Sequence, residues 1–226
     1  MSQALLQRRL AAVRARTAST LTAWWDQLPA HGRDQAEAFA ARAVPVVTAG
    51  QLVAARTTGL YVARRARIAP VALPRAAVTG SGARRGVDPL EEYQRPFGVV
   101  WGALGDDVEP DEAVARGRAR LALLAVTDVW LAMRAATAVI DQATPAITGW
   151  TRVADAGACE LCAAADGTPY DAAADLAGHP NCGCTSEPVL GDAPPSEPAD
   201  PDATDVEEHG ELGPLLVPAG ARLEEP

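Results

Sequence analysis

The stretch PDEAVARGRARLALLAVTDVWLAMRAATAVIDQA, residues 110–143, predicts a long helix. Within it, six apolar residues recur at alternating steps of four and three, which places them in a narrow seam along one helix face. They are Ala122, Val126, Val129, Met133, Ala136 and Ile140. Such a seam packs on another helix, so we expect this stretch to form part of the core of a helical body.

The N-terminal region, residues 1–69, predicts two more helices. Residues 2–28 repeat apolar side chains at steps of three and four, which is typical of an amphipathic helix. The next helix is expected to start at Asp34, because Glu37 three residues later resembles a capping box. Pro45 and Gly50 predict a kink or break within it.

A linker and a second helical region are expected next. Residues 70–87 contain two Pro and three Gly, which favours a linker. The second helical region is residues 88–146. Its first helix has Asp88 as a cap and Pro89 in the first helical position, which together indicate a helix start.

The composition agrees with a helical protein. The chain has 226 residues, of which 48% are hydrophobic but only 4% aromatic. The scarcity of aromatic and β-branched runs argues against a sandwich or barrel. No run reaches the ~18 apolar residues that a membrane-spanning helix needs, and the N-terminus lacks the uninterrupted apolar core of a signal peptide. We therefore expect no membrane partner.

Charge is divided unevenly along the chain. Residues 1–87 hold 13 Arg and 3 acidic residues, for a net charge of +10, whereas residues 88–184 carry −9 and residues 185–226 carry −10. The basic segment is expected to contact DNA or an acidic protein surface, or to be an ordinary solvated set of helix faces. The candidate contact residues are Arg8, Arg9, Arg64, Arg65, Arg67, Arg84 and Arg85.

The sequence changes character after Pro145. Residues 147–153 are β-prone, and Asp166-Gly167 is a hairpin-type turn, so residues 147–190 predict a small strand-containing module. Residues 191–226 are acidic and rich in Pro and are expected to be disordered. The predicted fold is mainly α, an elongated helical body with a small C-terminal zinc-binding-like module and an acidic tail.

All four cysteines lie within this module. Cys159 and Cys162 form a C-x-x-C pair, and His179, Cys182 and Cys184 follow within six residues of one another. A C-x-x-C turn supplies two corners of a tetrahedral Zn²⁺ site, and four ligands complete a structural site. We expect Cys159, Cys162 and Cys182 to be ligands, with the fourth place open between His179 and Cys184. Disulfides joining the two clusters are the alternative, and a catalytic metal is not expected.

Several enzyme classes lack their motifs in this sequence. Zinc deaminases need an H-x-E upstream of a P-C-x-x-C segment, and zinc proteases need H-E-x-x-H. Neither motif occurs, and no glycine-rich phosphate loop follows a strand. We therefore expect neither an enzyme nor a small-molecule substrate.

The chain resembles the MuF-like phage head morphogenesis (minor capsid) proteins of actinobacteriophages over about residues 85–190. The resemblance rests on the segment 149–153, the Cys159/Cys162 pair, Asp166-Gly167 and residues 179–184, and more weakly on residues 85–97. It implies a minor virion component, assembled in the bacterial cytoplasm with portal, capsid or scaffolding proteins and packaged DNA as partners. Gly183 stands where an Arg is frequent in the family, which leaves the thiols intact. No protease pairing is present, so the protease activity given to some relatives is not carried over.

Two other classes of function remain as alternatives. A nucleic-acid-binding regulator would read duplex DNA with the zinc module, yet Arg152 is the only basic residue of that module. A secreted effector stabilised by disulfides would need an export signal, which we do not find.

Overall fold

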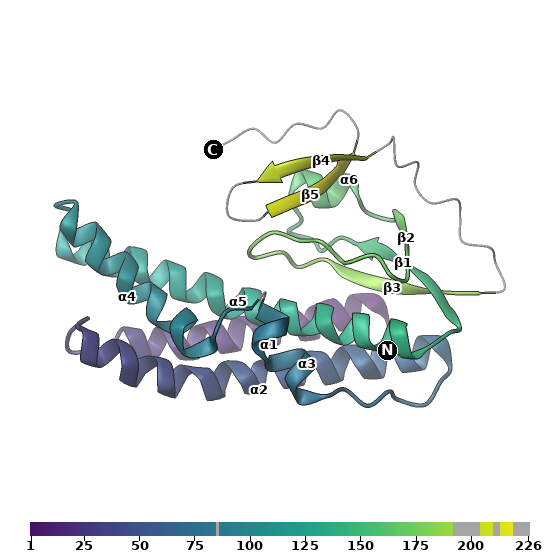
Figure 1. Ribbon diagram of the computed structural model, residues 1–226, viewed down its shortest axis with the longest axis horizontal. Coiled ribbons are helices and arrows are strands. Elements are labelled where there is room, and N and C mark those ends of the chain that lie inside the picture. Colours follow the sequence, from purple (N-terminus) through teal and green to yellow (C-terminus); the bar gives the residue numbers. More distant parts are fainter. Residues whose placement is uncertain (85, 192–203, 210–212, 219–226) are drawn as a thin grey trace.

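The computed structural model describes residues 1–84 and 86–191, together with the backbone of residues 204–209 and 213–218. Its elements in chain order are α1 (Gln3–Trp25), α2 (Arg33–Ala66), α3 (Arg75–Thr79), the 3-10 turn η1 (Ser81–Arg84), α4 (Pro89–Gly105), α5 (Pro110–Ala143), β1 (Ile147–Val153), α6 (Glu160–Ala164), β2 (Pro169–Asp171), β3 (Thr185–Leu190), β4 (Thr204–His209) and β5 (Gly213–Pro218). The chain is mainly helical, as predicted. Figure 1 shows an elongated bundle of α1, α2, α4 and α5, with the β1–β3 sheet on one side of it.

The apolar core falls into two clusters along the bundle. In one cluster, the rings of Trp25, Phe39 and Phe97 join α1, α2 and α4, with centroids 4.7–5.9 Å apart. The other cluster includes Trp130 of α5 and Trp150 of β1, both almost fully buried. The small sheet therefore shares its core with the helices instead of forming a separate one.

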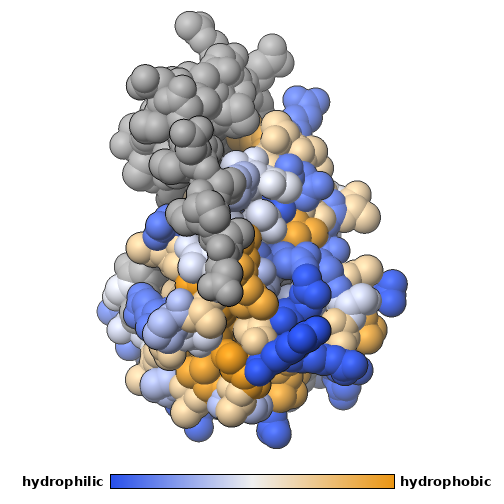
Figure 2. All heavy atoms as spheres, turned by 90° about the vertical axis from the view of Figure 1, so that its right-hand side faces the viewer, coloured by the Kyte–Doolittle hydropathy of each residue, from blue (hydrophilic) through white to orange (hydrophobic). Residues whose placement is uncertain are grey.

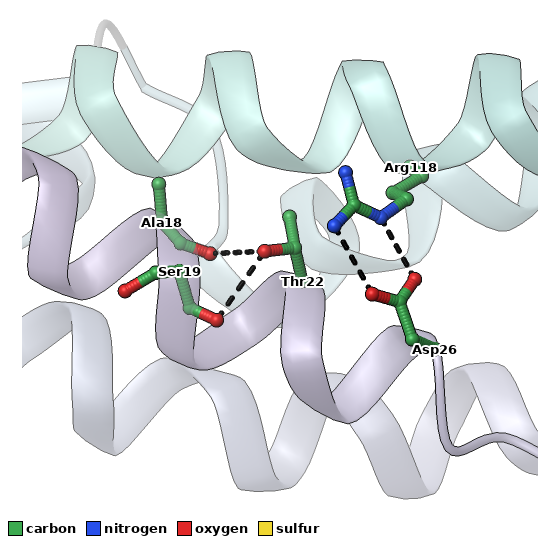
Figure 3. Close-up of polar contacts among 5 residues, drawn as sticks. All are labelled: Ala18, Ser19, Thr22, Asp26 and Arg118. Atoms are coloured by element: carbon green, nitrogen blue, oxygen red, sulfur yellow. Dashed lines mark hydrogen bonds and ion pairs between the residues drawn. The ribbon is translucent and has the colours of Figure 1, made fainter.

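Polar contacts fix the C-terminal end of α1 against α5 (Figure 3). The hydroxyl of Thr22 donates to the carbonyl oxygens of Ala18 at 3.0 Å and Ser19 at 3.3 Å. Arg118 of α5 donates from Nε and Nη2 to the two carboxylate oxygens of Asp26, at 2.7 and 3.0 Å. This two-point contact lowers the pKa of Asp26 below its ordinary value and sets the register between the helices.

The helix starts follow the sequence signals only in part. The carboxylate of Asp88 accepts from the backbone N–H of Leu90 at 2.8 Å and of Glu91 at 3.3 Å, which confirms the predicted cap of α4. The predicted capping box of α2 is wrong. The N-cap is Gly32, which makes no side-chain hydrogen bond, and Asp34 lies in the first turn, where its negative charge still favours the helix.

The predicted break in α2 does not occur, because the helix is continuous for 34 residues with Pro45 inside it. Pro45 removes one backbone donor, but Ala43 and Val47 on either side are completely buried, and this burial offsets the loss. At Gly50 a Cβ would lie 2.5 Å from the hydroxyl of Thr17 on α1. Gly50 is therefore needed for the close approach of two helices and does not break one.

The segment expected as a linker contains the short helix α3. Val78 of α3 is 1% exposed and packs in a small cluster with Ala55 of α2 and Ala136 of α5. Val71 and Leu73 of the same segment also pack against the bundle, so several apolar residues hold it there. The remainder of the Pro- and Gly-rich stretch connects α2 to α4 as expected.

The predicted seam of α5 is correct only in its second half. Ala122 and Val126 are partly exposed, and the buried positions there are Leu121, Leu124 and Ala125. A straight helix has 3.6 residues per turn, so a strict seven-residue pattern drifts away from one face. In addition, both α1 and α4 pack against α5, which widens its buried face.

The β-prone segment forms the central strand of a sheet with order β2-β1-β3, all antiparallel. Trp150 pairs with Tyr170 of β2, and their rings stack at 4.2 Å. The Asp166-Gly167 turn precedes β2, and Gly167 has the positive φ of 73° that such a turn requires. The predicted strand and turn are both confirmed.

Part of the tail expected to be disordered carries strands. β4 and β5 pair antiparallel, with Val206 opposite Leu216. Composition averaged over residues 191–226 hides the short apolar run of β5. For residues 192–203, 210–212 and 219–226, the expected disorder lies outside the described part of the chain.

Two helices are long and apolar enough to cross a membrane, whereas the sequence analysis found no apolar run of that length. They are α2 and α5, and 44% and 56% of their most apolar windows are buried inside the bundle. Core helices of a bundle pass the same test, so this is weak evidence for a membrane.

Candidate metal centre

The sheet brings the two Cys/His clusters together at one of its ends. Cys159 and Cys162 lie at the start of α6, in the connection from β1 to β2. His179, Cys182 and Cys184 lie in the connection from β2 to β3. Because β1 pairs antiparallel with both β2 and β3, its C-terminal end lies beside the start of each of them. Both connections therefore meet at that end.

The five side chains form two overlapping groups of three, which we call the Cys/His cluster. Cys159, Cys162 and His179 have ligand atoms within 4.8 Å of one another, and so do Cys162, Cys182 and Cys184. Cys162 is the member that the two groups share. All four cysteines are free thiols. These groups are close enough to bind a metal ion.

The distances within the cluster suit a tetrahedral ion. The Nε2 of His179 lies 3.2 Å from Cys159 Sγ and 3.5 Å from Cys162 Sγ, and Cys162 Sγ lies 3.9 Å from Cys182 Sγ. In a tetrahedral zinc site, bond lengths of about 2.3 Å to sulfur and 2.0 Å to nitrogen place neighbouring ligand atoms about 3.5–3.8 Å apart. The three measured distances are thus close to those between neighbouring ligand atoms of such a site.

The ring of His179 presents the nitrogen that a metal needs. Its Nδ1 lies 2.8 Å from the carbonyl oxygen of Pro180. A carbonyl only accepts, so Nδ1 donates to it, and Nε2 is the ring nitrogen that faces the sulfurs. A hydrogen bond of this kind commonly orients histidine ligands of metals.

A buried arginine lies beside the thiols. Arg152 of β1 is 6% exposed; its Nη1 is 4.0 Å from Cys162 Sγ, and its Nη2 donates to the carbonyl of Ala177 at 2.6 Å. Burial alone would lower the pKa of Arg152, but Tyr170 and the thiols of Cys162 and Cys184 raise it above the ordinary value. Arg152 therefore stays charged and favours thiolates.

The three thiols of the buried group do not share charge equally. Hydrogen bonds from Cys162 and Cys182 lower the pKa of Cys184, and the nearby Arg152 adds to this effect. Hydrogen bonds with Cys182 and Cys184, together with burial, raise the pKa of Cys162. Arg152 and the neighbouring thiols thus favour a thiolate within this buried group.

Two long helices anchor the ligand-bearing loop. Trp130 of α5 donates its indole N–H to the carbonyl of Cys184 at 2.8 Å. Arg14 of α1 donates from Nη2 to the backbone and side-chain oxygens of Asn181, at 3.0 and 3.1 Å. The sequence analysis missed Trp130, Arg14 and the role of Arg152. Their partners are 10 to 167 positions away in the sequence, so no local signal identifies them.

The basic contact candidates lie apart from the cluster. Arg8 and Arg9 are exposed on α1, and Arg64, Arg65 and Arg67 are exposed where α2 ends. Figure 2 views that end of the bundle, where hydrophilic side chains gather on one side of the face beside hydrophobic ones. Arg65 forms an ion pair with Glu187 of β3. The other four form no ion pair with any described residue. The side chains of Arg84 and Arg85 lie outside the described part.

No protein-family model matches the chain, and neither a curated protein nor a solved structure is significantly similar to it.

Proposed function

We propose that this chain is a non-enzymatic minor component of a phage head, of the MuF-like kind, in which a structural Zn²⁺ holds the C-terminal module on the helical bundle. The observation that carries the proposal is the Cys/His cluster. The motif on which the family resemblance rests supplies all five side chains, and they form two groups of three that share Cys162.

The donor chemistry supports zinc as the ion. Thiolates with one imidazole are the ligands of structural zinc sites, whereas calcium and magnesium take oxygen ligands. We assign Cys159, Cys162, Cys182 and His179 as the four ligands, because His179 Nε2 lies within 3.5 Å of two of the sulfurs. Cys184 then remains a completely buried neighbour whose carbonyl binds Trp130.

A structural role fits the surroundings of the cluster better than a catalytic one. Of the assigned cysteine ligands, Cys159 is exposed, whereas Cys162 and Cys182 are at most 5% exposed and belong to the same apolar cluster as Trp130 and Trp150. A closed site with four protein ligands leaves no open position for water or substrate. The ion would join loops that have little apolar core of their own, which is the usual task of zinc in small modules.

The arginines that form no ion pair with a described residue give the bundle a surface for a negatively charged partner. Arg8, Arg9, Arg64 and Arg67 are free to contact DNA phosphates or an acidic portal surface. Phosphate contacts would make binding fall steeply as salt rises. A regulator that reads DNA with its zinc module would instead bind through residues 147–190, which contain one basic residue.

Two measurements test the proposal. Elemental analysis of protein purified without a metal-binding tag should give one zinc per chain, and thiol counting after denaturation should give four free thiols. Disulfides between the clusters with no bound ion would overturn the zinc assignment. Mass spectrometry of purified phage particles should find the chain in far fewer copies than the major capsid protein. Its absence from particles would overturn the assignment to a phage head.

A further inference from the structure

Three of the five donors of the Cys/His cluster form a group made of sulfur alone, which we call the sulfur triad. Cys162, Cys182 and Cys184 have their Sγ atoms within 4.8 Å of one another, and all three are free thiols. Cys162 Sγ and Cys182 Sγ lie 3.9 Å apart. The zinc assignment above uses two of these thiols and leaves Cys184 without a ligand role. The triad is therefore a second donor set that overlaps the zinc site.

The triad is buried, unlike the other group of the cluster. Cys162 is 5% exposed, Cys182 is 2% exposed and Cys184 is 0% exposed. All three lie in the apolar cluster that the small sheet shares with the helices. In the other group, Cys159 is exposed. An ion held by the triad is therefore shielded from water and has three sulfur ligands.

This donor set selects a soft ion that is stable with fewer than four ligands. Calcium and magnesium take oxygen ligands, structural zinc is almost always four-coordinate, and iron–sulfur clusters are commonly held by four cysteines. Monovalent copper is favoured by thiolates and does not need a fourth ligand. Arg152 is 6% exposed, and its Nη1 lies 4.0 Å from Cys162 Sγ. Its positive charge offsets part of the negative charge of three thiolates around a monovalent ion.

We propose that the sulfur triad binds a monovalent copper ion and that copper bound there displaces zinc from the Cys/His cluster. Copper would take Cys162 and Cys182 from the four assigned zinc ligands, which leaves zinc with Cys159 and His179 only. The displacement rests on the zinc site proposed above, whereas copper binding by the triad does not.

Anaerobic titration of the full-length protein with Cu(I), in competition with a chromophoric Cu(I) chelator, measures the copper affinity. Both zinc-loaded protein and metal-free protein are titrated, and circular dichroism checks that the metal-free protein keeps its helices. The metal-free protein should bind one Cu(I) per chain. The zinc-loaded protein should release one zinc for each Cu(I) bound, as measured with a zinc indicator. Protein that cannot be loaded with zinc would overturn the zinc assignment, and the titration of the metal-free protein would still decide the copper site.

Thiol-to-serine variants separate the two binding modes. Cys184→Ser should weaken Cu(I) binding by at least about tenfold, because loss of even an outer-shell partner of a metal ligand costs 10–100-fold. Its zinc affinity should stay close to that of the wild type, which also shows that the variant is folded. Cys159→Ser is the matched control, since it makes the same chemical change outside the triad. It should weaken zinc binding and leave Cu(I) affinity unchanged, and His179→Ala should do the same.

Four outcomes would overturn the proposal. One is a metal-free protein that does not bind Cu(I), and another is a Cys184→Ser protein that binds Cu(I) as tightly as the wild type. The third is a Cys159→Ser protein that loses as much copper affinity as Cys184→Ser, because the triad would then not be the site. The fourth is zinc that remains bound after one Cu(I) has been taken up, which would exclude displacement.

Discussion

Replacing Cys162 by serine should remove metal binding more completely than replacing Cys184, which is buried beside it. Cys162 is the one residue common to both groups of ligand atoms. Its Sγ lies 3.5 Å from His179 Nε2 and 3.9 Å from Cys182 Sγ, so it occupies a corner between the two loops. Without Cys162, the remaining donors form two separate pairs, Cys159 with His179 and Cys182 with Cys184.

The size of the effect follows from the number of ligands. Structural zinc sites in small modules bind with about 10–16 kcal/mol, so one of four ligands accounts for about 3 kcal/mol. That corresponds to about a hundredfold loss of affinity. Cys184→Ser should bind zinc nearly as tightly as the wild type, because we assign His179 as the fourth ligand.

Competition against a chromophoric zinc chelator measures both affinities on the same scale. Circular dichroism of each variant should show that most of the helical signal remains, because the apolar cluster around Trp25, Phe39 and Phe97 joins the helices and contains no cysteine. If Cys162→Ser keeps the wild-type affinity, the cluster is not the zinc site. If Cys184→Ser loses as much as Cys162→Ser while His179→Ala loses nothing, the fourth ligand is Cys184.

Three further substitutions test the packing around the site. Trp130→Phe removes the donor to the buried carbonyl of Cys184. It should lower the free energy of unfolding in urea, at saturating zinc, by about 1–3 kcal/mol. An unchanged midpoint would mean that this hydrogen bond does not hold the loop. Gly117→Ala gains about 1 kcal/mol of helix propensity, yet its Cβ would lie 2.6–2.8 Å from atoms of α1 and α4. Overpacking should cost about 1–3 kcal/mol, which outweighs that gain and lowers the melting temperature. A raised melting temperature would contradict the close packing. Burial raises the pKa of Asp141 to about 7. Ionisation therefore opposes folding increasingly above the unfolded pKa near 4, and fully above pH 7. Asp141→Asn should raise the free energy of unfolding above that of the wild type by up to about 4 kcal/mol at pH 8 and by almost nothing at pH 4. Denaturant titrations that give the same increase at both pH values would contradict this.

Local signals in the sequence were sufficient where the chemistry is local. Asp88 and Pro89 begin α4 because a cap and a fixed φ act within one turn. The C-x-x-C pair and residues 179–184 were identified as a ligand set because metal binding requires particular side chains at short spacing. The same reasoning failed at Pro45 and Gly50, where burial against other helices outweighs the local preference.

The parts of the site that the sequence did not reveal depend on distant contacts. Trp130 looks like any aromatic residue on the buried side of α5, and only the fold shows that its N–H reaches Cys184, 54 positions later. Arg14 belongs to a helix with several exposed arginines, and its contact with Asn181 spans 167 positions. Neither role produces a periodicity or a motif, because both arise from the way α1 and α5 lie against the loop.

These anchors imply that metal binding and helix packing support each other. The donors of the second loop are held through Trp130 on α5 and Arg14 on α1, while the first loop contacts Arg152 of the central strand. An ion that joins the two loops would therefore connect three separate elements through short side chains. Because Cys162, Cys182 and Cys184 also belong to the apolar cluster with Leu6 and Trp150, loss of the ion would disturb that core as well as the loops. A module so placed is a fixed part of the helical bundle.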